Sequence, residues 1–178
     1  DLDPQGSVHH SLGIDKKDGV GVCEVFLTPG ISLQDIVQNS KHQNLDLLLS
    51  NIQDLLAEQT VNKIAADYYH ISQWLEQNAS SDYEFIIIDA PASTSPISIN
   101  AMLAADLIIV PLECEALAIK SLKRFLQAFK ELQKNIEPGL RLAGILLTMY
   151  DDEILSHQQV CRQIYQTLGD SVFETIIP

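Results

Sequence analysis

Apolar runs that recur along the chain constrain its fold more than any other feature of the sequence. Each run is short, rich in Ile, Leu and Val, and nearly free of the polar alternation that marks a strand with one solvated face. Runs of this kind are typical of strands that are buried on both faces of a parallel sheet. We predict five such strands, over residues 45–50, 84–89, 106–111, 140–149 and 172–177.

The segments between these runs are long enough to hold crossover helices. The clearest helix is predicted over residues 115–135, where five apolar side chains share one face: Leu122, Phe125, Leu126, Phe129 and Leu132. Two more helices are expected over 61–77 and 154–168, and short helices over 19–38, broken by Thr28, Pro29 and Gly30. This alternation predicts a doubly wound α/β fold, with a mostly parallel sheet and helices on both faces.

Length, composition and charge narrow the class of protein. With 178 residues, 46% of them hydrophobic, residues 1–178 fit one globular domain, and no apolar run approaches the roughly 18 residues of a membrane-spanning helix. The 24 acidic and 11 basic side chains give a net charge of −13. This charge opposes non-specific binding to nucleic acid or anionic lipid over most of the surface, so any nucleic-acid contact must be local.

The cysteines and the first residue bear on the protein's surroundings. Cys23, Cys114 and Cys161 stand far apart, without a CxxC pair, so neither a zinc site nor a disulfide framework is indicated. We therefore expect a reducing, cytoplasmic compartment. The sequence begins at Asp1 without Met and shows no leader-like segment, so we expect a fragment.

The opening Asp-Leu-Asp-Pro-Gln-Gly-Ser, residues 1–7, is the first motif that could carry chemistry. It has two carboxylates at a spacing of two, followed at once by residues that turn the backbone. If a strand ends at Asp1, both carboxylates lie at the carboxyl edge of the sheet, where open α/β sheets bind ligands. There they could hold water around a metal ion or orient an attacking water. The alternative is an ordinary strand end followed by an Asp-Pro turn.

The second motif is the predicted strand over 84–89, which ends in a single carboxylate, Asp89, followed by Ala-Pro. A Walker B Asp, which contacts Mg²⁺ or its water shell beside bound phosphates, has this layout. Apolar strands that end in Asp are common, however. The pattern therefore gains its weight from its combination with the opening motif.

Together these motifs resemble the deviant Walker-type ATPases of the ParA and Soj partition family, to which MinD-like ATPases are related. Asp-x-Asp-Pro-Gln-Gly is the specific signature. The similarity extends over nearly the whole chain, through residues 1–14, 45–51, the strand to Asp89, 100–115, 144–151 and 176–178.

The resemblance implies a P-loop ATPase of plasmid or chromosome partitioning. Such a protein binds ATP with Mg²⁺, forms an ATP-dependent homodimer, and is switched off by hydrolysis, which a ParB-like partner stimulates. Non-specific DNA binding would come from a C-terminal segment beyond residue 178, and no membrane contact is expected.

The resemblance also implies roles for individual residues. Asp3 would be the catalytic residue of switch I that positions the attacking water, and Asp1 and Asp89 would lie at the Mg²⁺ ion. Pro91 would begin the switch II loop, and residues 148–149 and 178 fall where the family builds its adenine pocket. The nucleotide-binding residues implied are Pro4, Gln5, Gly6, Pro91, Thr148, Met149 and Pro178.

The chain also departs from the family pattern. The phosphate loop Lys-Gly-Gly-x-Gly-Lys-Thr is absent, and the single Gly-x-Gly, at residues 19–21, has no lysine after it. That loop would precede Asp1, and the family continues beyond residue 178, so we expect a chain that is cut at both ends and inactive as given. Ser7, Leu49 and Ala92 stand where the family usually has Asn, Pro and Pro, and none of these changes is read as inactivating.

Two further interpretations stay open. A naturally degenerate ATPase-like module could bind a partner protein without hydrolysis, and a MinD-like ATPase could position division machinery, which predicts an amphipathic tail that seeks membranes. Five of the 11 basic residues also lie on the helix predicted over 115–135: Lys120, Lys123, Arg124, Lys130 and Lys134. They could bind DNA or a partner, although a solvated helix face is the commoner explanation.

Overall fold

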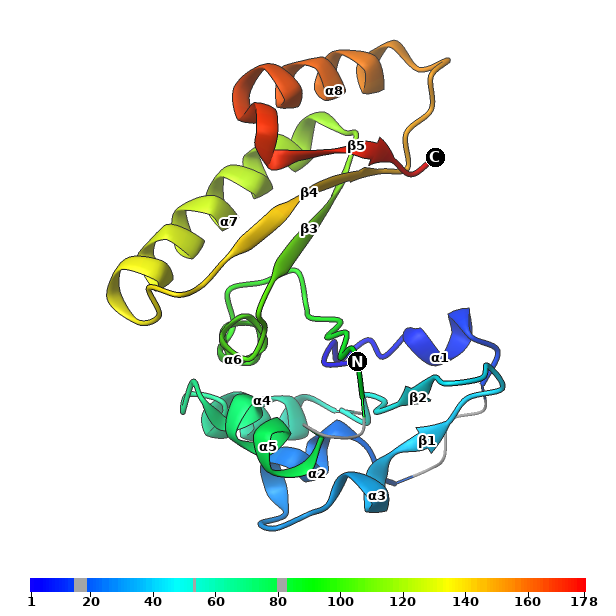
Figure 1. Ribbon diagram of the computed structural model, residues 1–178, viewed down its shortest axis with the longest axis vertical. Coiled ribbons are helices and arrows are strands. Elements are labelled where there is room, and N and C mark those ends of the chain that lie inside the picture. Colours follow the sequence, from blue (N-terminus) through cyan, green and yellow to red (C-terminus); the bar gives the residue numbers. More distant parts are fainter. Residues whose placement is uncertain (15–18, 53, 80–82) are drawn as a thin grey trace. The chain divides into compact units, whose positions relative to one another are not determined.

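The computed structural model describes residues 1–14, 19–52, 54–79 and 83–178, and its contacts group the chain into two compact units, residues 1–105 and 106–178 (Figure 1). Unit 1 is built mainly of short helices around a small antiparallel hairpin. Its elements are α1 (Val8–Ser11), α2 (Val22–Leu27), α3 (Leu33–Ile36), β1 (Gln38–Asn39), β2 (Asp46–Leu47), α4 (Leu55–Ile64), α5 (His70–Asn78) and α6 (Pro96–Leu103).

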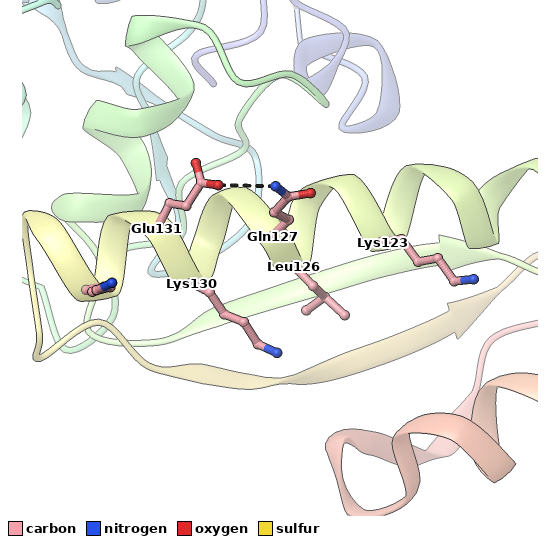
Figure 2. Close-up of a pocket in the computed structure, with 6 residues that line it drawn as sticks. Lys123, Leu126, Gln127, Lys130 and Glu131 are labelled. Atoms are coloured by element: carbon pink, nitrogen blue, oxygen red, sulfur yellow. Dashed lines mark hydrogen bonds between the residues drawn. The ribbon is translucent and has the colours of Figure 1, made fainter.

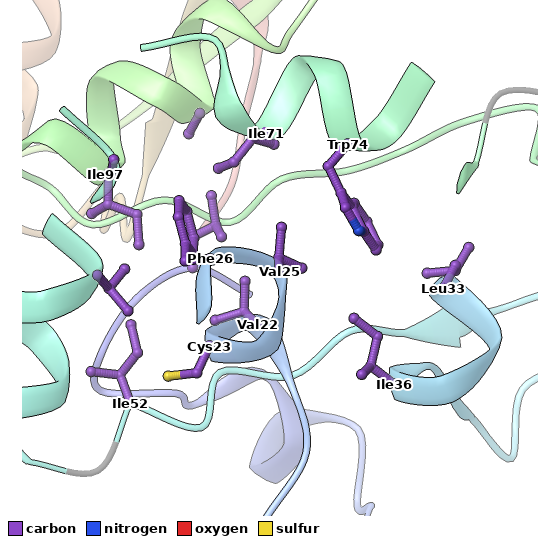
Figure 3. Packing of buried hydrophobic residues seen from close by; sticks show 14 of the residues in the cluster. Val22, Cys23, Val25, Phe26, Leu33, Ile36, Ile52, Ile71, Trp74 and Ile97 are labelled. Carbon is purple, nitrogen blue, oxygen red and sulfur yellow. The ribbon is translucent and has the colours of Figure 1, made fainter. Parts of the chain in front are cut away.

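The core of unit 1 forms where α2, α4, α5 and α6 bring their apolar sides together (Figure 3). Val22, Val61 and Ile97 are almost completely buried in it. Trp74 packs against the same cluster, and its indole N–H donates to the carbonyl of Ile31 at 3.0 Å. The short helices over 19–38 are thus confirmed as α2 and α3, held by burial rather than by length.

A polar network fixes the start of α2. The Glu24 carboxylate accepts the backbone N–H of Gly21 at 2.7 Å and the side-chain amide of Asn51 at 2.8 Å. The Asn51 oxygen in turn accepts the N–H of Cys23 at 2.8 Å. A Cβ at Gly21 would collide with the carbonyl oxygen of Leu49, so the close approach of these two backbones requires glycine.

The prediction of one helix over 61–77 is wrong, because the chain forms α4 and α5 with a break between them. The side chain of Asn100 on α6, which is fully buried, explains the break. It donates to the carbonyls of Ala65 at 2.7 Å and Asp67 at 2.8 Å and accepts the N–H of Ile71 at 2.9 Å. In a continuous helix the carbonyl of Asp67 would accept the N–H of Ile71, and that of Ala65 the N–H of Tyr69. The Asn100 side chain bonds to Ala65, Asp67 and Ile71 where these helical bonds are missing.

Unit 2 is a three-stranded parallel sheet with crossover helices (Figure 1). The strand order is β3-β4-β5, with Val110 opposite Ile145 and Ile145 opposite Val172. Its elements are β3 (Ile108–Glu113), α7 (Ala116–Asn135), β4 (Leu142–Thr148), α8 (Leu155–Leu168), a 3₁₀ turn (Gly169–Ser171) and β5 (Val172–Ile176). The three strands and two helices predicted for this part of the sequence are confirmed to within two residues at nearly every end.

The core of unit 2 lies between the sheet and its helices. Ile145 and Leu147 of β4 are completely buried there, together with Leu122 of α7 and Ile164 of α8. The apolar stripe of α7 packs against this core along the helix, which stabilises a helix of this length. No helix in the described residues is long and apolar enough to cross a membrane.

Two predicted strands of unit 1 are not found as predicted. Residues 45–50 contribute only β2, which pairs antiparallel with β1. Residues 84–89 form no strand and pair with none among the described residues, and Phe85 and Ile87 are 78% and 89% exposed. A strand needs neighbours on both sides to be buried, and the described chain supplies this segment with one backbone hydrogen bond, at Asp89.

Candidate functional site

Two backbone hydrogen bonds bring the two acidic motifs of unit 1 together. The N–H of Leu2 donates to the carbonyl of Asp89 at 2.7 Å. On the other side, the amino group of Asp1 donates to the carbonyl of Leu48 at 2.9 Å. The backbone of residues 1–2 therefore lies between these two segments, with Leu2 against Asp89.

The side chains of Asp1 and Asp3 shape the loop that follows them. The Asp1 carboxylate accepts the N–H groups of Asp3 at 3.3 Å and of Val8 at 3.4 Å, and it thereby closes the loop on itself. One Asp3 oxygen accepts the N–H of Gln5 at 2.8 Å, and the Asp3 carbonyl accepts the N–H of Gly6 at 2.9 Å. Gly6 has φ of +58°, a left-handed conformation that glycine adopts freely. The predicted residues 4–6 thus form a tight turn, and the second Asp3 oxygen takes no hydrogen bond from the described residues.

The carboxylate of Asp89 is exposed and accepts no hydrogen bond from the described residues. The negative charge of the Asp89 carboxylate interacts with the amino group of Asp1. Burial lowers the pKa of that group from its ordinary 8.0, and the Asp89 carboxylate acts in the opposite direction. Because the Asp89 carboxylate is exposed and accepts no hydrogen bond from the described residues, it is available to a cation.

The donor set suits a magnesium ion that is held from one side. Three or more side chains of His, Cys, Asp or Glu do not gather as a metal site anywhere in the described residues. Protein Mg²⁺ sites beside phosphates commonly use one or two carboxylates, with water and phosphate oxygens as the other ligands. Asp89 fits this pattern, and Asp1, each of whose oxygens accepts one N–H group, also holds the loop.

The segment after Asp89 is tied back to the start of α6. The carbonyl of Pro91 accepts the N–H of Ser93 at 2.7 Å and the hydroxyl of Ser98 at 3.1 Å. The hydroxyls of Ser93, Ser95 and Ser98 lie within 2.9–3.1 Å of one another. The signal that the sequence offers for this cluster is Ser95-Pro96, a common helix start.

The three residues predicted for an adenine pocket lie together in unit 2. The N–H of Ile177 donates to the carbonyl of Leu147 at 2.9 Å, and the N–H of Tyr150 donates to the carbonyl of Ile177 at 3.2 Å. These bonds place Thr148 and Met149 beside the chain that ends at Pro178. Met149 is 64% exposed and has φ of +53°, an unusual conformation for a residue with a side chain.

Comparison with known proteins gives this arrangement a family. The sequence model of the AAA domain family matches residues 1–142. The sporulation initiation inhibitor protein Soj of Bacillus subtilis is 32% identical over 178 residues, which are 100% of this chain and 70% of that protein. The chromosome-partitioning ATPase Soj of Thermus thermophilus is 34% identical over 178 residues, 100% of this chain and 67% of that protein.

A solved structure extends the likeness to three dimensions. Cobyrinic acid a,c-diamide synthase from Mycobacterium smegmatis, with bound ADP and magnesium, has a TM-score of 0.85 and 31% sequence identity. The match covers 99% of this chain and 71% of that one. The fold is thus the P-loop NTPase-like α/β fold that the sequence predicts. The match to the family model and the identity with the two Soj relatives show that the chain belongs to the ParA/Soj family of P-loop partition ATPases.

Proposed function

We propose that these residues form the hydrolysis and switch part of a ParA-type ATPase of plasmid or chromosome partitioning, in which MgATP joins two copies and hydrolysis separates them. The hydrogen bond from Leu2 to Asp89 is the observation that carries the proposal. It joins the backbone between Asp1 and Asp3 to that of Asp89, which supports the pairing of a water-positioning carboxylate with a cation-facing one that phosphoryl transfer to water needs. The name of the Thermus thermophilus relative, chromosome-partitioning ATPase Soj, suggests the cellular process.

Each acidic residue has a distinct task in this mechanism. Asp3 uses its remaining carboxylate oxygen to orient a water for attack on the γ-phosphate. Asp1 holds the loop through the N–H groups of Asp3 and Val8, so that Asp3 keeps its position. Asp89 faces the cation or its water shell. Bound Mg²⁺ would neutralise the charge that develops on the phosphate oxygens.

Nucleotide binding needs a further element. The 178 residues contain no Lys-Gly-Gly-x-Gly-Lys-Thr loop, and carboxylates alone repel a triphosphate. The proposal therefore concerns a polypeptide that supplies this loop together with these residues. A ParB-like protein as the stimulating partner, DNA contact outside these residues, and nucleotide contacts by Pro4, Gln5, Gly6, Pro91, Thr148, Met149 and Pro178 belong to the same proposal.

The first test is to read the coding sequence upstream of Asp1 for an in-frame strand and a lysine-containing glycine loop, and to express the product with its loop. In that protein, Asp3→Ala should keep MgATP binding and dimer formation but slow hydrolysis at least about tenfold. Asp89→Ala should instead weaken binding only when Mg²⁺ is present. Asp152→Ala, an exposed change in unit 2, is the matched control and should leave both properties unaltered.

The outcomes separate the proposal from its rival. Unchanged turnover in Asp3→Ala would remove the role of Asp3, and equal affinity with and without Mg²⁺ in both the parent and Asp89→Ala would remove that of Asp89. The other candidate is a module that binds a partner without hydrolysis, and failure of the full product to bind MgATP would favour it. A stop codon or an unrelated segment upstream of Asp1 would support that module.

A further inference from the structure

The exposed face of α7 carries a concentration of positive charge that the ATPase mechanism does not use. All five of its basic residues are exposed and lie on one side of the helix: Lys120, Lys123, Arg124, Lys130 and Lys134. We call this surface the basic face of α7. At about 1.5 Å per residue it extends roughly 21 Å along the helix. It lies wholly within unit 2.

These cations are not neutralised within the described parts of the chain. No ion pair joins any of the five to another described residue. The one acidic residue of α7, Glu131, accepts a hydrogen bond from the neutral side chain of Gln127 at 3.2 Å. Figure 2 shows Glu131 and Gln127 on one side of the helix and Lys123, Leu126 and Lys130 on the other. Both side chains nevertheless line the same hollow as the lysines, and no ion pair joins Glu131 to any of them in the described parts of the chain.

Helix stability does not account for this arrangement. Lys134 lies in the last turn, where a cation is favourable to the helix dipole, but Lys120 and Arg124 lie in the first half of α7. Lys120 with Arg124, and Lys130 with Lys134, are also like-charge pairs at i,i+4, each of which costs a few tenths of a kcal/mol. The face therefore weakens the isolated helix slightly, which a bound anion would reverse.

An apolar side chain lies among the cations. A shallow hollow of about 410 Å³ is lined by residues of the basic face and their neighbours, namely Lys123, Leu126, Gln127, Lys130, Glu131 and Lys134. Leu126 is half-buried and packs against the core of unit 2, so its position is fixed from below. The methylene stems of the flanking lysines widen this apolar floor while their ammonium groups stay in water.

We propose that the basic face of α7 docks an acidic amphipathic segment of a partner protein, whose apolar side chain covers Leu126 while its carboxylates pair with Lys123 and Lys130. Charge complementarity favours an anionic partner. The exposed part of Leu126 favours an anionic partner that also carries an apolar side chain. A phosphate backbone would leave Leu126 uncovered, and the net charge of −13 repels a long polyanion outside this face. A peptide that alternates carboxylates with an apolar side chain satisfies both parts of the surface.

Fluorescence anisotropy with this chain tests the proposal. The probe is a labelled helical peptide of about 16 residues, long enough to span the face, with glutamates around one leucine stripe. It should bind saturably. Lys123→Glu with Lys130→Glu should weaken binding at least about tenfold. The matched control, Lys63→Glu with Arg162→Glu, makes the same charge change on α4 and α8, and should alter binding less than about twofold.

Two comparison probes identify the occupant. The same peptide with its leucines replaced by glutamine should bind several-fold more weakly, since only the charge term remains. A DNA duplex of about 20 base pairs should bind more weakly than the leucine peptide. Absence of peptide binding, an equal loss in the control variant, equal binding of the glutamine peptide, or tighter binding of DNA would each overturn the proposal. If the glutamate variant does not fold by circular dichroism, Lys123→Gln with Lys130→Gln makes the same test.

Discussion

Replacing Asn100 by alanine tests how unit 1 is held together. The Asn100 side chain is fully buried, and it satisfies three backbone groups from two other parts of unit 1. Its amide donates to the carbonyls of Ala65 and Asp67, and its oxygen accepts the N–H of Ile71. Alanine would remove all three partners at once and leave a small cavity. The break between α4 and α5 would then lack the group that stabilises it.

The expected loss of stability follows from which groups stay buried. The bonds to Ala65 and Ile71 are buried, and an unsatisfied buried group costs about 1–3 kcal/mol. The bond to Asp67 is only partly buried, so water can replace it at little cost. We therefore expect Asn100→Ala to lower the free energy of unfolding of unit 1 by about 3 kcal/mol. This is a large share of the roughly 5–15 kcal/mol that stabilises a typical protein.

Urea unfolding followed by the fluorescence of Trp74 measures this loss. Trp74 is the single tryptophan of the chain and is buried in unit 1, so its signal reports on the unit that contains Asn100. Asn62→Ala is the matched control. Asn62 is half-buried, and its oxygen accepts the N–H of Ile97 over a longer 3.4 Å, so its loss should cost less than about 1 kcal/mol. Equal losses in the two variants would refute the assignment of Asn100 as the central polar contact.

A glycine substitution at the start of α2 tests a close backbone approach in unit 1, and a glycine in unit 2 serves as its control. Gly21→Ala should destabilise unit 1 by about 2 kcal/mol in urea unfolding, because the new Cβ meets the carbonyl of Leu49, whereas Gly139→Ala should cost far less, since it meets the flexible end of a glutamate side chain.

How much of the fold the sequence predicts depends on where each segment finds its partners. In unit 2 every strand pairs with a neighbour that one crossover helix connects to it, so local periodicity is enough to predict β3, α7, β4, α8 and β5. In unit 1 the decisive contacts come from far along the chain. The side chain that ends α4 and begins α5 is Asn100, about 30 residues away, and no helical pattern over 61–77 reveals it.

The sequence likewise predicts some features of the candidate site but not others. The family signature predicts that Asp1, Asp3 and Asp89 act in one site, and the bond from Leu2 to Asp89 brings the backbone of the first motif against the second. The roles within that site come from hydrogen bonds that a motif does not contain. Because the Asp1 carboxylate already accepts two N–H groups and the Asp89 carboxylate accepts none in the described chain, the first supports the loop and the second can face a cation.

The segment over 84–89 shows what an apolar pattern does and does not predict. Its run of large apolar side chains predicts a strand, but the backbone here forms neither a strand nor a helix. Burial cannot be predicted from the segment alone, because it depends on which neighbouring segments cover the side chains. Phe85 and Ile87 are exposed where the pattern predicts burial, since no strand in the described chain lies along them. An apolar side-chain pattern thus shows that a segment would be stable as a buried strand. Whether it forms one depends on neighbouring strands that can hydrogen-bond to its backbone and cover its side chains.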